Sequence, residues 1–117
     1  MAIHADFSIQ GQFIVNSAGT VYNVTIARDR TKNTPDLSPP DPTDNTWYVH
    51  HHSGSLMKKL SIQNLSDTPI HFSYSNGERW STLLNKGAQW EGNVNIKFFM
   101  VKADAGGSLF QFTAAGV

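Results

Sequence analysis

The sequence has 117 residues, no cysteine, and nine basic residues that balance nine acidic ones, which predicts a single domain, 1–117, without disulfides. Zero net charge and the lack of a basic run argue against nucleic acid or an anionic membrane as a partner. No apolar run approaches the ~20 residues that span a bilayer, and the N-terminus lacks a secretion signal, so we expect a soluble protein without membrane insertion.

Two strands are predicted first along the chain. Apolar and polar residues alternate from Phe7 to Val15, and again from Val21 to Ile26, which is the period of a half-buried strand. Gly11 interrupts the first run, and we expect it to mark a β-bulge or a point of close approach.

A long proline-rich loop follows, from Ala27 to Asn45. Proline withdraws a backbone donor and disfavours helix in the residue before it, so this segment is expected to be extended and exposed. Loops of this length are usually functional or disordered, and two interpretations remain open: a surface loop without a partner, or an arm that lies on a neighbouring subunit. The prolines that would make such a contact are Pro35, Pro39, Pro40 and Pro42.

The rest of the chain predicts short strands at regular spacing, separated by turn signals. The predicted strands are Trp47–Ser53, Leu56–Asn64, Ile70–Ser75, Arg79–Leu84, Gln89–Glu91, Ile96–Ala103 and Leu109–Thr113. The pair Asn76-Gly77 is the strongest turn signal, because it accepts the positive φ angles of a type I′ hairpin. No segment shows the apolar period of a helix, so the sequence predicts an all-β chain. We expect an antiparallel β-sandwich, jelly-roll-like, with about eight or nine short strands.

The second-to-last predicted strand is apolar on both faces. Ile96, Phe98 and Met100 fill one face, and Phe99 and Val101 place apolar groups on the other. A strand that is apolar on both faces is normally covered on both sides. In so small a chain the second cover could be another subunit, with Phe99 and Val101 at the interface.

Three consecutive histidines raise the question of a metal site. On a strand His50 and His52 project to the same face, as in the His-x-His pair of cupin-like metal enzymes. Such a site needs a glutamate shortly afterwards, but the next glutamate is Glu78. His71 could approach from another strand, because three nitrogen ligands suffice for catalytic zinc. The alternative, a solvated or interface histidine cluster, is the interpretation we favour, and no cofactor is expected.

Catalysis by side chains alone is not indicated either. The chain has no cysteine, no Gly-x-Ser-x-Gly motif and two glutamates, and its seven aspartates lie mainly in predicted loops. We therefore do not expect an enzyme.

Several aromatic residues could instead form a platform on which sugar rings stack. The stretch YSNGERW places Tyr74 and Trp80 on the two arms of one hairpin, with Arg79 near its tip to bind hydroxyl groups, and Trp90 could extend the platform. The competing interpretation is that these aromatics belong to the core or to a subunit interface, which is the usual place for them in small β-domains.

The second half of the chain reads LSIQNLSDTPIHFSYSNGERWSTLLNKGAQWEGNVNIKFFMVKADAGGSLFQFT, from Leu60 to Thr113. A strand that ends in Asn64 before a short turn, a hairpin, a Leu84-Asn-Lys-Gly87 step and a final hairpin resemble the layout of small β-sandwich domains in bacteriophage and other viral structural proteins. The resemblance implies a virion component, such as a decoration, spike, fibre or tail-associated subunit. It also implies assembly with copies of itself, commonly as a trimer, and with other virion proteins.

Two functions of different classes are therefore predicted. The first is a structural subunit whose apolar strand faces and proline-rich loop make the contacts. The second is a lectin-like module that binds glycans, such as those of a host cell, through the aromatic platform. A viral spike can combine the two.

Overall fold

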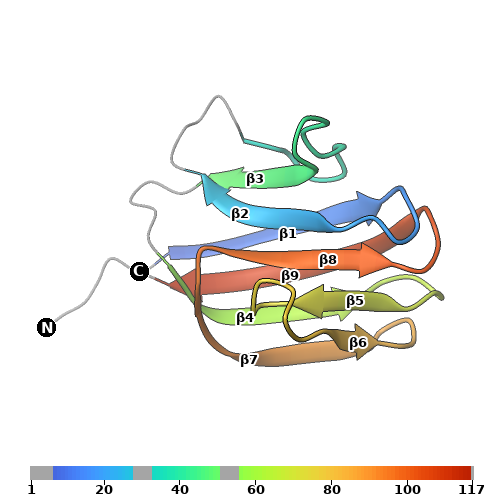
Figure 1. The fold of residues 1–117 in the computed structure, drawn as a ribbon. Coiled ribbons are helices and arrows are strands. Elements are labelled where there is room, and N and C mark those ends of the chain that lie inside the picture. The colour runs from blue at the N-terminus through green and yellow to red at the C-terminus, as the bar shows by residue number, and fades with distance from the viewer. Residues whose placement is uncertain (1–6, 28–32, 51–55, 117) are drawn as a thin grey trace, which may run out of the picture.

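The computed structural model describes residues 7–27, 33–50 and 56–116, and within them the chain is all-β, with nine strands and no helix (Figure 1). The strands are β1 (Phe7–Val15), β2 (Tyr22–Ala27), β3 (Thr46–His50), β4 (Met57–Asn64), β5 (Ile70–Ser73), β6 (Ser81–Leu83), β7 (Gln89–Ile96), β8 (Phe98–Ala103) and β9 (Ser108–Gly116). The predicted all-β fold class is confirmed. None of the described segments is a helix long and apolar enough to cross a membrane.

The strands form two sheets that pack face to face as a β-sandwich (Figure 1). Sheet A has four strands in the order β1-β9-β4-β7, and sheet B has five in the order β3-β2-β8-β5-β6. Neighbouring strands are antiparallel with one exception, β2 and β3, which run parallel. Parallel neighbours need a crossover longer than a hairpin, and the proline-rich loop supplies it. The predicted antiparallel sandwich is therefore corrected at this one pair.

The core lies between the two sheets and is rich in aromatic rings. Trp47 of β3 is completely buried and stacks on Phe13 of β1, with ring centroids 4.8 Å apart, so this pair joins the sheets at one end. Phe99 of β8 meets Phe112 of β9 edge to face at 5.4 Å. Burial of one such side chain is worth roughly 1.5–3 kcal/mol, which makes these contacts a main source of stability.

The second-to-last predicted strand, Ile96–Ala103, begins later than predicted, because Ile96 ends β7 and β8 begins at Phe98. The chain bends at Lys97, where β7 of sheet A ends and β8 of sheet B begins. Phe99 and Val101 are both 0% exposed and point into the core of their own chain, so their predicted place at a subunit interface is wrong. The side chains of β8 that face outward and remain partly exposed are Phe98 and Met100.

The described part of the proline-rich loop folds back onto the edges of its own sheets. The Leu37 backbone N–H donates to the Gln12 carbonyl of β1 at 2.8 Å, and the Thr34 N–H donates to the Tyr48 carbonyl of β3 at 2.6 Å. The indole N–H of Trp47 also donates to the loop, at the Ser38 carbonyl, at 3.0 Å. The loop therefore ties the edge of one sheet to the edge of the other.

The exposed side chains of this loop include apolar ones, beside the polar Asp36, Thr43 and Asp44. Pro35, Pro39 and Pro42 are exposed, Pro40 is half-buried, and Leu37 is 56% exposed. These side chains are presented to solvent by a backbone that is fixed from behind. Their contact with a neighbouring subunit stays a prediction.

Two local predictions are confirmed. Asn76 and Gly77 have φ angles of 59° and 84°, as a type I′ hairpin requires at both central residues. Gly11 is a point of close approach, because a Cβ there would lie 2.8 Å from Cε1 of Phe112. It is not a bulge, since the register of β1 with β9 is continuous.

Asn64, at the end of β4, fixes the turn that follows. Its side chain is completely buried. Its Nδ2 donates to the carbonyls of Thr68 and Leu83, both at 2.9 Å, and its Oδ1 accepts the N–H of Ser66 at 2.8 Å. One amide thus links sheet A, the β4–β5 turn and β6, which explains why asparagine ends this strand.

Candidate functional site

A hollow of about 690 Å³ opens beside the connection between β5 and β6. We call it the aromatic hollow, and it is lined by Tyr74, Ser75, Glu78, Arg79, Trp80 and Ser81. Three of the four residues predicted to bind a glycan therefore lie around one hollow. Because they follow one another within a single hairpin, local sequence alone was enough to bring them together.

Serine side chains hold the backbone of this hairpin. The buried hydroxyl of Ser73 accepts the N–H groups of Ser75 and Gly77, at 3.3 and 3.0 Å. The hydroxyl of Ser75 in turn accepts the N–H of Arg79 at 2.9 Å. The rim of the hollow is therefore ordered before any ligand arrives, which lowers the entropic cost of binding.

The aromatic rings around the hollow are also supported from behind. Tyr74 is 41% exposed and stacks on Trp90 with centroids 5.0 Å apart and 22° between the planes, and Trp90 packs on the core residue Phe72 at 5.1 Å. On the other wall, the ammonium of Lys102 lies 4.3 Å from the centroid of Trp80. Trp90 thus supports the platform and does not line the hollow.

His71 is used inside sheet B. One ring nitrogen contacts the Thr82 hydroxyl and the other the Asp104 carboxylate, both at 2.8 Å, so neither is left to bind a metal. Within the described residues no three His, Asp or Glu side chains could hold a metal ion together. The side chain of His50, and all of His51 and His52, lie outside the described residues.

The order of hydroxyl, imidazole and carboxylate at His71 matches that of a nucleophile triad. The Asp104 side chain is however 59% exposed, so its carboxylate is solvated and cannot polarise the imidazole as a buried one does. We interpret the arrangement as a tie between β5, β6 and the turn after β8. Sequence reasoning missed it, because the three residues meet only through the sheet register.

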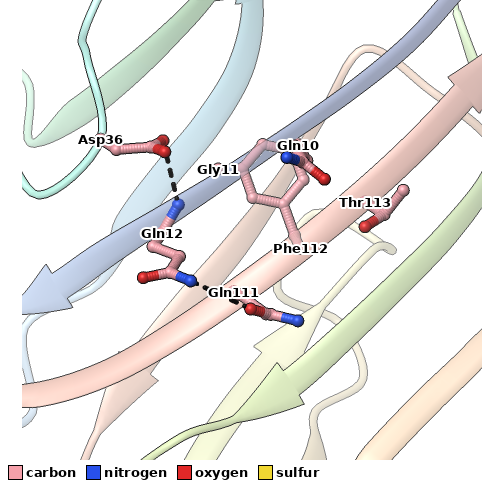
Figure 2. A pocket seen from close by; sticks show the side chains of 7 residues that line it. All are labelled: Gln10, Gly11, Gln12, Asp36, Gln111, Phe112 and Thr113. Carbon is pink, nitrogen blue, oxygen red and sulfur yellow. Dashed lines mark hydrogen bonds between the residues drawn. The ribbon is translucent and has the colours of Figure 1, made fainter.

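Glutamine side chains form a row across the outer face of sheet A. Gln12, Gln111, Gln63 and Gln89 are register partners on β1, β9, β4 and β7. Figure 2 shows Gln12 Nε2 donating to Gln111 Oε1, at 3.1 Å, and Gln111 Nε2 donates onward to Gln63 Oε1 at 3.2 Å. Three of the four amides are thus linked across the sheet, whereas Gln89 Nε2 donates to the Ser61 hydroxyl at 2.9 Å. The hollow of about 80 Å³ beside the row is small.

The outer face of sheet B is different, because apolar side chains project from β8. Phe98 separates two hollows of about 340 and 400 Å³. The first is lined by Asn23, Thr25, Thr46, Tyr48, Phe98 and Met100, and the second by Leu56, Tyr74, Ser75, Asn76, Asn95, Ile96, Lys97 and Phe98. We call the partly exposed side chains of β8, Phe98 and Met100, the apolar strip.

Tyr48 borders the apolar strip and carries a perturbed hydroxyl. It donates a hydrogen bond to the carboxylate of Asp44. This bond, with partial burial and the negative charges of Asp44 and Asp41, raises the pKa of Tyr48 above its ordinary value. The shift therefore delays ionisation of this phenol at alkaline pH.

No family model, curated protein or solved structure matches this chain. Function must therefore be inferred from its own surfaces. The aromatic hollow and the apolar strip are the two that carry chemistry a partner can recognise.

Proposed function

We propose that the chain is a non-enzymatic structural subunit, which acts through contacts with copies of itself and with neighbouring proteins. The observation that carries the proposal is the apolar strip, which sheet B presents on its outer face. Because the second half resembles viral structural domains, we propose that this role is exercised in a virion, as a decoration, spike, fibre or tail-associated subunit, with the trimer as the favoured form.

The physical reason is the cost of leaving these side chains in water. Phe98 lines both hollows and Met100 lines one of them, so a partner can insert side chains on both sides of the Phe98 ring. Each Å² of apolar surface removed from water contributes about 25 cal/mol. The exposed prolines of the loop and Leu37 add a second apolar surface to the same subunit.

Mass in solution tests this proposal. Light scattering of the full chain should give a stable oligomer, and Phe98→Asp should lower its mass while the circular dichroism of the fold is retained. Leu84→Asp is the matched control, because Leu84 is 60% exposed on a turn away from the apolar strip, and it should leave the mass unchanged. A wild-type monomer at every concentration would contradict the proposal.

A second candidate function is carbohydrate binding in the aromatic hollow. It is favoured by the ordered rim and by the supported rings of Tyr74 and Trp80, on which the C–H face of a pyranose can stack. Arg79 and Glu78 are exposed on the rim and can bind sugar hydroxyls. The ligand class is a saccharide, and host glycans are the candidates if the chain is a viral spike.

A glycan array followed by fluorescence titration tests the second candidate. A binding sugar should quench tryptophan emission, and Trp80→Ala should abolish binding. Gln10→Ala, on the opposite sheet, should bind as the wild type does. An array without any bound glycan, or equal binding by Trp80→Ala, would exclude this site while leaving the assembly proposal intact.

A further inference from the structure

The four sheet edges of the sandwich differ in how they are protected. On β1 the loop covers the edge, because Leu37 N–H donates to the Gln12 carbonyl and the Gln12 N–H donates to Asp36 Oδ1 at 3.2 Å. The edge strands of sheet B are short, with five residues in β3 and three in β6. β7 is an edge strand of eight residues without proline.

The outer edge of β7 is open. In the described part of the chain its backbone bonds run to β4, and no backbone hydrogen bond joins its other side to any segment. A long edge of this kind is a template for pairing with another strand, and natural proteins usually block it with proline, a bulge or charge. The one ionisable side chain on β7 is Glu91, and the pairing of this strand with β4 shifts register between Asn93 and Ile96.

The core is also incompletely covered at this edge. The inward residues of β7 include Trp90, Val94 and Ile96, and all three stay partly exposed although they pack against the core. Opposite them in sheet B lies β6, which is less than half as long as β7. A strand added beside β7 would therefore bury apolar side chains as well as satisfy backbone groups.

The charges beside β7 fit a second copy of this chain. Lys58 of β4 donates to the Asn95 side chain, so its ammonium lies at the end of β7. If two β7 strands pair antiparallel about a two-fold axis through Asn93, Glu91 of each copy falls opposite Asn95 of the other. Glu91 then approaches Lys58 of the second copy, and symmetry makes this contact twice.

The same charges disfavour the neighbouring register. A two-fold axis through Glu91 would place the two Glu91 carboxylates directly opposite each other, and like charges opposite each other destabilise a strand pair. In the Asn93 register Trp90 instead lies opposite Ile96 of the second copy, on the face that packs on the core. Charge therefore disfavours the Glu91-centred pairing, whereas the Asn93-centred pairing brings Glu91 near Lys58 of the second copy and keeps apolar residues opposite each other.

We propose that β7 pairs with β7 of a second copy of the chain, centred on Asn93, and joins the two copies of sheet A into one continuous sheet. The inference rests on the self-association proposed above and adds a two-fold contact to it, separate from the apolar strip. The main-chain bonds supply affinity, and the Glu91–Lys58 pairs set the register.

Charge reversal and mixing test the pairing. Glu91→Lys places two lysines together and Lys58→Glu places two glutamates together, so each variant alone should associate about tenfold more weakly or worse. Mixed in equal amounts, the two variants should recover wild-type association, because both contacts then join opposite charges. Asp67→Lys, an exposed acid on the β4–β5 turn, is the control and should behave as the wild type does.

Zero-length crosslinking gives a second readout that does not depend on the variants. A carbodiimide joins a carboxylate to an amine that it touches, with loss of water. In a mixture of isotopically labelled and unlabelled wild-type chains, mass spectrometry should find a Glu91–Lys58 peptide that joins the two isotopes.

The outcomes separate this inference from the proposed function. A wild-type monomer would overturn both. An oligomer that withstands both charge reversals and gives no mixed-isotope Glu91–Lys58 crosslink would overturn the β7 pairing alone and leave the apolar strip as the contact. Recovery on mixing, together with the crosslink, would establish the pairing.

Discussion

Side chains alternate between the inner and outer faces in both sheets, yet the outer face of sheet A carries a row of polar side chains and that of sheet B carries apolar ones. On sheet A the outward glutamines meet in register, and Gln111 accepts a hydrogen bond from Gln12 and donates one to Gln63. On sheet B the outward residues of β8 include Phe98 and Met100, which have no covering segment among the described residues. The outer face of sheet A forms side-chain hydrogen bonds within the sheet, whereas the outer face of sheet B leaves apolar surface that a partner can cover.

The two faces differ in how much free energy a partner gains by covering them. A polar row that is internally bonded gains little from a partner, since its hydrogen bonds would only be exchanged. Apolar surface gains whenever water leaves it. A face-on partner is therefore expected on sheet B, and sheet A is expected to associate through its free edge and not through its face.

The largest expected effect is the difference in stability between an aspartate on the inward face of β8 and one on its outward face. Val101→Asp places a carboxylate in the core without a partner and should cost about 4 kcal/mol or more of unfolding free energy, enough to prevent folding. Met100→Asp, one residue earlier, faces outward and should change stability by about 1 kcal/mol or less. Thermal and urea unfolding of the pair measures this, and equal losses would mean that the assigned register of β8 is wrong.

The second effect concerns the close approach at Gly11. Gly11→Ala adds a Cβ that must lie 2.8 Å from a Phe112 ring atom, so the strands or the ring must move. We expect a loss of about 1–3 kcal/mol. Gln10→Ala on the outer face is the matched control and should cost much less. A neutral Gly11→Ala would show that the core near Phe112 is loosely packed.

The third effect tests whether the glutamine hydrogen bonds on the outer face of sheet A contribute to stability and not to assembly. Gln111→Leu breaks the amide row at its centre and removes two side-chain hydrogen bonds. The loss should be about 1–2 kcal/mol, because the exposed partners can bond to water instead. Light scattering should find the same oligomer as for the wild type, in contrast to Phe98→Asp. A change in mass would mean that the face of sheet A also takes part in assembly.

The smallest effect is the pH dependence from Tyr48 on sheet B. Its pKa is raised in the folded state, so its hydrogen bond stabilises the fold fully below the ordinary tyrosine pKa of 10.0, and this contribution is lost as the pH rises through the folded value. Tyrosinate absorbance should show a phase above the ordinary tyrosine pKa, and Tyr48→Phe should remove it. A titration curve that Tyr48→Phe leaves unchanged above that pKa would contradict the assignment.

Local sequence signals predicted the strands and the aromatic hollow well. The hairpin at Asn76-Gly77 follows from the φ angles that the pair accepts, and it places Tyr74 and Trp80 near each other. The corner at Lys97 was missed and Ile96 was counted with Phe98 and Met100, because alternation does not show where the chain passes from one sheet to the other. That error reversed the inside and outside of β8, and so put Phe99 and Val101 on the wrong face.

What the sequence by itself determined is the set of strands, the turns between them and the absence of charge and cysteine chemistry, because these depend on residues next to one another. The tertiary structure alone decided which residues meet across strands. The glutamine row, the Thr82–His71–Asp104 tie and the open edge of β7 all arise from sheet order and register. Register is fixed by the packing of the whole core, since a shift by one residue would turn every side chain of a strand to the other face.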